Sequence, residues 1–241
     1  MKILAIGNSF SQDTTRYLQS IAKADGENMK VVNLYIGGCP LRLHYINALE
    51  DRKNYEIQLH GESIGFFASI KEALISDMWD VVTLQQASLQ SFNYDTYQPY
   101  LSFLADYGRK YCPKTKIYVH QTWAYEDGTE RLHNMGSEKS ADMFLDIKKA
   151  YQQAFKDINA DGMISSGALM QELLNNGIEK VHRDGFHASL GLGRYALGLL
   201  WYKFLTGKDI ADNSFADFDE EITMEQIDIV KKCVNKIAKE I

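Results

Sequence analysis

The sequence predicts a three-layer α/β fold, in which helices cover both faces of a doubly wound, five-stranded parallel sheet. Short apolar runs rich in β-branched residues alternate with helical patterns along almost the whole chain. Strand–helix alternation of this kind gives a parallel sheet between two helical layers, and right-handed crossovers leave few topologies. No internal repeat, low-complexity segment or Pro/Ser-rich linker divides the 241 residues. We therefore expect one domain, residues 1–241.

Five apolar runs are the predicted strands. In chain order they are KILAIG (2–7), KVVNLYIGG (30–38), WDVVTLQQ (79–86), TKIYVHQTW (115–123) and the weaker DGMISSG (161–167). One further segment, residues 50–62, contains an alternation of Tyr55, Ile57 and Leu59. That alternation predicts a small additional strand or a hairpin.

The stretches between these runs have the periodicity of helices. The predicted helices span residues 14–25, 63–78, 94–111, 139–159, 169–176, 190–205 and 224–241. The last begins with a capping-box pattern, Thr223 to Gln226. Residues 123–137 form a polar and aromatic loop just past the carboxyl end of a strand, where open α/β sheets bind ligands. We expect this loop to be a wall of a site.

Composition narrows the choice of partners and compartment. The formal net charge is −6 and no dense Lys/Arg block is present, so nucleic acid is not an expected partner. No apolar run approaches the roughly 20 residues that span a bilayer, and residues 3–6 are too short for a signal-peptide core. Three widely spaced cysteines indicate free thiols. We expect a cytoplasmic protein, or a periplasmic or secreted one if a leader has been removed. The sequence makes no prediction of oligomeric state.

The first strand leads into the turn Gly7-Asn8-Ser9-Phe10-Ser11. Its serines and asparagine are suited to capping the helix that follows. Ser11 and Asp13 lie closer to the helical pattern and can serve as caps, which leaves Ser9 for another role. A serine hydroxyl is a weak nucleophile at neutral pH and needs a base beside it.

A candidate base stands near the other end of the chain, in the stretch HRDGFHASLGLGRYALG, residues 182–198. Asp184 and His187 are three residues apart, so on a tight loop the carboxylate can accept a bond from Nδ1–H of the imidazole. Nε2 is then free to act as a base, as in a serine triad. The alternative is an ordinary polar loop with a turn at Asp184-Gly185.

Taken together, the two motifs resemble the SGNH (GDSL-like) hydrolase superfamily, in which the nucleophile turn comes first and Asp-x-x-His last. The resemblance implies a flavodoxin-like fold, with Ser9 as nucleophile, His187 as general base and Asp184 as the acid that orients it. It also implies that the backbone N–H of a glycine after the second strand helps to hold the oxyanion. Gly38 is the best match for that glycine.

Two departures from the family pattern mark a divergent branch. The first block has Asn8 where aspartate is usual, and the Gly-x-Asn-Asp block after the third strand is replaced by TLQQASLQS. The missing amide donor of the oxyanion hole is then expected from Gln86, with Gln85 or Ser88 as alternatives. The alternative is that these are ordinary polar residues at the end of a strand, with no role in a site.

The predicted function is a serine esterase that cleaves an acyl ester on a carbohydrate or another small substrate. The alternative is a catalytically weak or inactive SGNH-fold protein that binds a glycan or other ligand. No cofactor is implied, since dinucleotide and phosphate-loop glycine patterns are absent. No metal site is predicted, because the six histidines lack ligand spacing. His120 and Trp123 end the fourth predicted strand and either line the site or pack beneath it.

Overall fold

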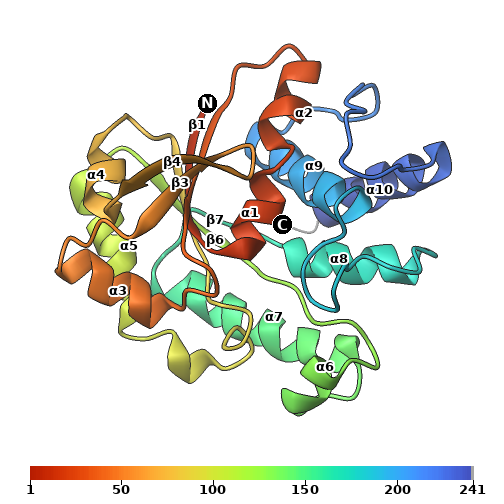
Figure 1. Ribbon diagram of the computed structural model, residues 1–241. Coiled ribbons are helices and arrows are strands. Elements are labelled where there is room, and N and C mark those ends of the chain that lie inside the picture. Colours follow the sequence, from red (N-terminus) through yellow and green to blue (C-terminus); the bar gives the residue numbers. More distant parts are fainter. Residues whose placement is uncertain (240–241) are drawn as a thin grey trace.

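The computed structural model describes residues 1–239, and its centre is one seven-stranded sheet with the order β4-β3-β2-β1-β5-β6-β7 (Figure 1). The strands are β1 (Lys2–Gly7), β2 (Lys30–Tyr35), β3 (Tyr55–Leu59), β4 (Glu62–Ala68), β5 (Val81–Leu84), β6 (Lys116–His120) and β7 (Gly162–Ile164). The run from β2 to β7 in this order is parallel, and it contains the five predicted strands. The three-layer α/β architecture is as predicted, but the strand count of five is wrong.

The two extra strands form a hairpin at one edge of the sheet. β3 pairs antiparallel with β2, and β4 pairs antiparallel with β3. Helical periodicity predicted a helix over residues 63–78, but its first half is the strand β4. The helix α4 (Ile70–Ile75) begins only after Ser69, which caps it. The side chains of β4 are exposed on both of its faces as far as Phe67, so the strand carries no alternation of apolar and polar residues.

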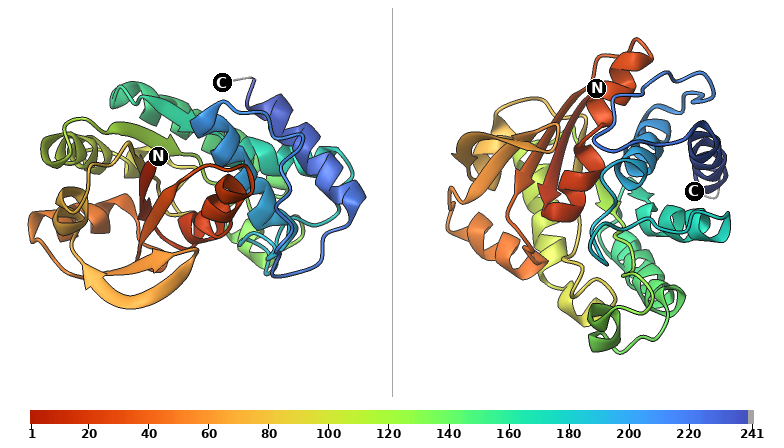
Figure 2. Two further views of the ribbon diagram at one scale, coloured as in Figure 1. Left: turned by 90° about the horizontal axis from the view of Figure 1, so that it is seen from above. Right: turned by 45° about the vertical axis from the view of Figure 1, so that its right-hand side comes forward.

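The helices form the outer layers. They are α1 (Ser9–Thr15), α2 (Leu18–Ala24), α3 (Leu41–Leu49), α5 (Tyr100–Tyr111), α6 (Glu130–Asn134), α7 (Ser140–Asp157), α8 (Ser166–Asn175), α9 (Leu192–Thr206) and α10 (Met224–Ile237), besides α4 and a short 3-10 turn, Tyr94–Thr96. Helices α1, α2 and α9 pack together on one face of the sheet, and α4, α5 and α7 lie on the other (Figures 1 and 2). No helix in residues 1–239 is long and apolar enough to cross a membrane.

The ends of the helices show where local sequence signals were sufficient. The capping box at the start of α10 is present, since the Thr223 hydroxyl accepts from the N–H of Gln226 and the Gln226 side chain accepts from the N–H of Thr223. The first helix differs from the prediction, because α1 begins at Ser9 and not at Thr14. Its cap is Asn8, whose Oδ1 accepts from the N–H of Phe10. The last two residues predicted for α10 lie outside the described part.

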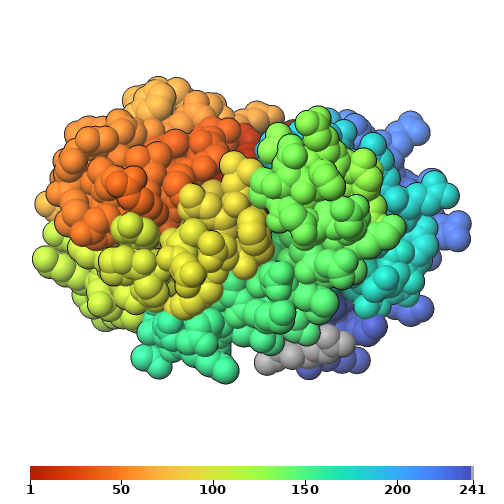
Figure 3. Space-filling view, turned by 90° about the horizontal axis from the view of Figure 1, so that it is seen from below, coloured from red at the N-terminus to blue at the C-terminus, as the bar shows by residue number. Residues whose placement is uncertain are grey.

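The carboxyl ends of the parallel strands meet at the lower edge of the sheet in Figure 1. β1 is the central strand of the order, and Ile3, Leu4 and Ala5 within it are fully buried. Seen from below, α3 (orange), the segment after β5 (yellow) and the segment 121–139 (green) surround this edge (Figure 3). Because β1 is central and buried, its carboxyl end at Gly7 lies in the middle of this edge. Ser9, two residues later, therefore lies there too.

Candidate active site

Ser9 is the first residue of α1 and follows β1 after a tight turn. A Cβ atom on Gly7 would lie 2.5 Å from the Ser11 Oγ and 2.9 Å from the Gln85 Cδ, so any larger residue would displace these two buried side chains. The Ser9 side chain is partly exposed at the carboxyl edge of the sheet. As the first helical residue, Ser9 has a backbone N–H without a partner inside the helix.

His187 lies on the loop between α8 and α9, and its ring joins Ser9 to Asp184. Nε2 is 2.8 Å from the Ser9 Oγ, and Nδ1 is 2.7 Å from the Asp184 Oδ2. The other Asp184 oxygen accepts from the backbone N–H of His187 at 2.9 Å. The His187 ring therefore contacts both of the residues that the sequence analysis combined with it, Ser9 through Nε2 and Asp184 through Nδ1.

The charge on Asp184 is favoured by its contacts with His187. Burial by itself would raise the pKa of this carboxyl. The hydrogen bonds from the His187 ring and from the His187 backbone N–H more than offset it, and the pKa lies below its usual value. Asp184 is therefore ionised at neutral pH and can stabilise a positive charge on the imidazole.

A buried carboxylate anchors the loop that carries His187. Asp13 has no exposed surface and accepts from Arg183 Nη1 and Arg194 Nε, each at 2.9 Å. It also accepts from the backbone N–H of Ala188 at 3.1 Å. Asp13 stands one helical turn after Ser9, so a single segment holds both the serine and the loop of its partner. The sequence prediction missed this role; the available signal was one charged residue on the inner face of a helix.

Beneath Ser9, a chain of buried polar side chains holds the turn. Asn8 Nδ2 donates to the carbonyl of Cys39 at 3.3 Å, and Asn8 Oδ1 accepts from Gln85 Nε2 at 2.9 Å. Gln85 therefore presents Oε1 to Nδ1 of His120, 2.8 Å away. The His120 Nε2 then accepts from the Ser166 hydroxyl at 3.1 Å. Burial lowers the pKa of His120 to about 3, so this ring is neutral and its tautomer is set by Gln85.

The two glutamines after β5 have different surroundings. Gln85 lies against the turn of Ser9, as described, whereas the amide of Gln86 faces α3. Gln86 Oε1 accepts from the N–H of Leu41 at 2.9 Å, and Gln86 Nε2 donates to the carbonyl and the hydroxyl of Thr96, both at 3.1 Å. The expectation that Gln86 is the free amide donor does not fit this geometry, because its N–H groups are already engaged.

The turn after β2 holds Gly38 in a conformation that favours glycine. Its φ is +61°, and a Cβ there would meet nothing within 4 Å. Gly37 and Gly38 are exposed, and no hydrogen bond among the described residues uses the N–H of Gly38. The bond from Asn8 to Cys39 ties this turn to that of Ser9. Two backbone N–H groups, of Ser9 and Gly38, are thus available at neighbouring strand ends.

His120 and Trp123 do not reach the surface, since both have no exposed area. Trp123 stacks on Phe10 with ring centroids 4.1 Å apart, and its Nε1 donates to the carbonyl of Phe186 at 2.8 Å. A direct contact of either residue with substrate, one of the two roles considered, is excluded by this burial. Instead, they pack beneath the site: His120 contacts Gln85 under the Ser9 turn, and Trp123 contacts Phe10 and Phe186, the neighbours of Ser9 and His187 in the chain.

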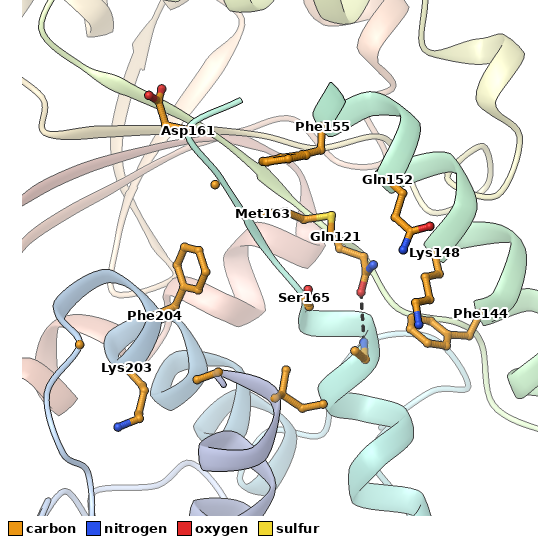
Figure 4. A pocket seen from close by; sticks show the side chains of 15 residues that line it. Gln121, Phe144, Lys148, Gln152, Phe155, Asp161, Met163, Ser165, Lys203 and Phe204 are labelled. Atoms are coloured by element: carbon orange, nitrogen blue, oxygen red, sulfur yellow. Dashed lines mark hydrogen bonds between the residues drawn. The ribbon is translucent and has the colours of Figure 1, made fainter. Parts of the chain in front are cut away.

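A cavity of about 720 Å³ lies apart from this site, along the open edge of β7 between α7, α9 and α10 (Figure 4). Phe155 and Met163 line one part of it, and Phe204 another. It contains no pairing of a nucleophile with a base. Nowhere in residues 1–239 do three or more His, Cys, Asp or Glu side chains gather as metal ligands would.

Comparison with known proteins identifies a family that matches almost the whole chain. A protein family described as a domain of unknown function, DUF4886, matches residues 2–236. A crystal structure of a DUF4886 family protein from Bacteroides uniformis has 30% identity and a TM-score of 0.89, covering 98% of this chain and 93% of that one. No protein of curated function matches.

The same fold is found in hydrolases of lower identity. A candidate SGNH hydrolase from Slackia heliotrinireducens has 22% identity and a TM-score of 0.61, covering 84% of this chain and 97% of that one. A candidate GDSL-like lipase from Parabacteroides merdae has 16% identity and a TM-score of 0.56, covering 86% and 95%. The fold is therefore that of the SGNH/GDSL-like hydrolases.

Proposed function

The chain belongs to the DUF4886 family, and from the geometry of its site we propose that it is a serine hydrolase that cleaves carboxylic esters. The observation that carries the proposal is the pair of distances at His187, 2.8 Å to Ser9 and 2.7 Å to Asp184. A nucleophile, a base and an orienting acid in this order are what acyl transfer requires. The SGNH-like fold supports the proposal by analogy.

The reaction proceeds in two halves. Ser9 Oγ attacks the acyl carbonyl while His187 Nε2 takes its proton, and Asp184 stabilises the imidazolium. The tetrahedral intermediate collapses, the C–O bond to the alcohol breaks, and His187 gives the proton to the leaving oxygen. Water then attacks the acyl-enzyme with His187 again as base, which releases the acid and restores Ser9.

In this proposal, backbone N–H groups stabilise the oxyanion. The N–H of Ser9 and the N–H of Gly38 have no other partner among the described hydrogen bonds, whereas the Gln86 amide is occupied by Thr96. Gln85 acts on the intermediate only indirectly, by holding Asn8. A donor made of backbone alone is pre-organised, because its position is set by the turn and not by a rotamer.

The substrate we propose is an acyl ester on a carbohydrate or another small molecule. Hydrolysis of p-nitrophenyl acetate tests the chemical part. Ser9→Ala should lower the rate roughly 10³-fold or more, and Ser63→Ala, an exposed serine of β4, is the matched control. An unchanged rate in Ser9→Ala contradicts the proposal. A native protein without turnover would indicate the alternative, an SGNH-fold protein that binds a glycan or other ligand.

A further inference from the structure

Arg131 of α6 stacks on the ring next to the proposed base. Its Cζ lies 3.8 Å from the centroid of the Phe186 ring, and that ring lies 3.8 Å from the centroid of the His187 ring. The guanidinium is thus separated from the imidazole by one aromatic ring. Tyr125 is also close, with its centroid 5.8 Å from Cζ of Arg131. Two rings therefore hold this arginine beside the site.

The charge of Arg131 is not balanced by a carboxylate. The chain has seven arginines, and five of them form ion pairs: Arg16, Arg52, Arg109, Arg183 and Arg194. The other two, Arg42 and Arg131, form no ion pair among the described residues. Arg42 stands in the first turn of α3, after Gly38, and Arg131 beside His187. In a protein of net charge −6, an arginine without an ion pair thus lies one aromatic ring away from the imidazole of the candidate site.

A stacked guanidinium keeps its hydrogen-bond donors available. The five N–H groups of arginine lie in its plane and point away from the ring it covers. One of them interacts with the Tyr125 hydroxyl. Arg131 is exposed, so the remaining donors can meet a ligand. The stacking also holds the side chain in place, which lowers the entropy lost when it binds.

The position of Arg131 indicates which half of an ester it would meet. His187 returns its proton to the leaving oxygen, so the alcohol half must lie on the histidine side of the reacting carbon. Only the ring of Phe186 separates Arg131 from the His187 ring that gives this proton. We propose that Arg131 binds an anionic group on the alcohol half of the ester, an inference that rests on the proposed function. The substrate is then an acyl ester of a sugar acid or of another alcohol that carries an anionic group.

Paired esters of matched shape test this inference. An O-acetylated uronic acid and the corresponding O-acetylated neutral hexose differ in the carboxylate alone, and an O-acetylated sugar phosphate separates carboxylate from phosphate recognition. We expect kcat/KM to favour an anionic ester about 10-fold or more over the neutral one. Arg131→Gln should bring this ratio close to unity, Arg131→Lys should retain part of it, and added salt should weaken it. Arg52→Gln, an exposed arginine of a surface ion pair, is the matched control.

Three results would overturn the inference: an unchanged ratio in Arg131→Gln, an equal fall of kcat/KM for the charged and the neutral ester, or loss of the ratio in Arg42→Gln alone. Calorimetry separates it from the proposed function. Ser9→Ala should bind the free uronic acid, and Ser9→Ala/Arg131→Gln should bind it about 10-fold more weakly. A protein that binds the acid through Arg131 and hydrolyses no ester refutes only the proposed function.

Discussion

The turns that carry Ser9 and Gly38 lie at the ends of neighbouring strands, yet they are built in opposite ways. Beneath Ser9, the side chains of Asn8, Gln85 and His120 are buried and bonded to one another. Around Gly38, the backbone is exposed and its N–H is unbonded. A nucleophile must be held in one position, whereas an oxyanion donor must keep its hydrogen for the transition state. Changes to the Ser9 turn should therefore cost more than changes to the Gly38 turn.

Among changes to the residues that support the two turns, the largest effect is expected from Asn8→Asp, although aspartate is the usual residue of the SGNH block. Asn8 donates from Nδ2 to the Cys39 carbonyl, and a carboxylate would oppose that oxygen inside the protein. The positive amino end of α1 offsets only part of this cost. We expect a loss of roughly 1–3 kcal/mol in the free energy of unfolding and a fall of roughly 10²-fold in kcat.

Denaturant unfolding and ester hydrolysis measure these two quantities. Asn28→Asp, at an exposed asparagine, is the control for added charge. If Asn8→Asp is as stable and as active as the native protein, the bond to Cys39 has no importance for the turn.

The second effect is the loss of stability at acidic pH that His120, buried beneath the Ser9 turn, should cause. The pKa of His120 is near 6.5 in the unfolded chain and about 3 in the folded one, because burial disfavours the charged ring. The unfolded state therefore binds more protons between these values, and stability falls as the pH drops below 6.5. At pH 5 the loss from this residue should be about 2 kcal/mol relative to pH 7. Unfolding of His120→Gln should show a smaller loss; an equal loss in both proteins would contradict the burial argument.

Third, the two glutamines should differ in what they affect. Gln85→Ala removes the support of Asn8, so kcat should fall about 10-fold with little change in KM. Gln86→Ala leaves the N–H of Leu41 without its acceptor, so it should lower stability by about 1–3 kcal/mol with a smaller effect on kcat. Steady-state kinetics and thermal unfolding of the two variants decide. A larger fall in kcat for Gln86→Ala would restore the glutamine expected from the sequence.

The smallest effect should come from the exposed turn. Gly38 and Gly207 both have positive φ, +61° and +69°, and both have open space where a Cβ would stand. Alanine at either position should cost about 1–2 kcal/mol of stability through the left-handed backbone. Relief of that strain moves the N–H of Gly38, so Gly38→Ala alone should lower kcat several-fold. Equal kcat in the two variants would remove Gly38 from the oxyanion hole.

The sequence was sufficient where function depends on local order. Ser9 follows the central strand, and Asp184 and His187 are close in the chain, so topology and spacing brought the three together without knowledge of packing. The five parallel strands were also predictable, since buried strands have continuous apolar runs. The hairpin was only partly visible, because β4 is exposed on both faces and lacks alternation.

What the sequence could not provide is the direction of side chains outside regular structure. β5 ends at Leu84, so alternation along the strand does not decide which of Gln85 and Gln86 faces Ser9. The ion pairs of Asp13 with Arg183 and Arg194 connect residues 170 and 181 positions apart, and no local sequence pattern predicts them. Such contacts depend on how the loop before α9 packs against α1.

A fluorophosphonate probe tests most directly whether Ser9 is the nucleophile, because the site of its covalent adduct can be mapped. We expect a single adduct on the peptide that contains Ser9, with labelling lost in Ser9→Ala and strongly slowed in His187→Gln, because only a serine with its base reacts rapidly. Control labelling of Ser63→Ala should equal that of the native protein. An adduct on another residue, or no adduct in the folded native protein, would contradict the assignment of Ser9 as the nucleophile.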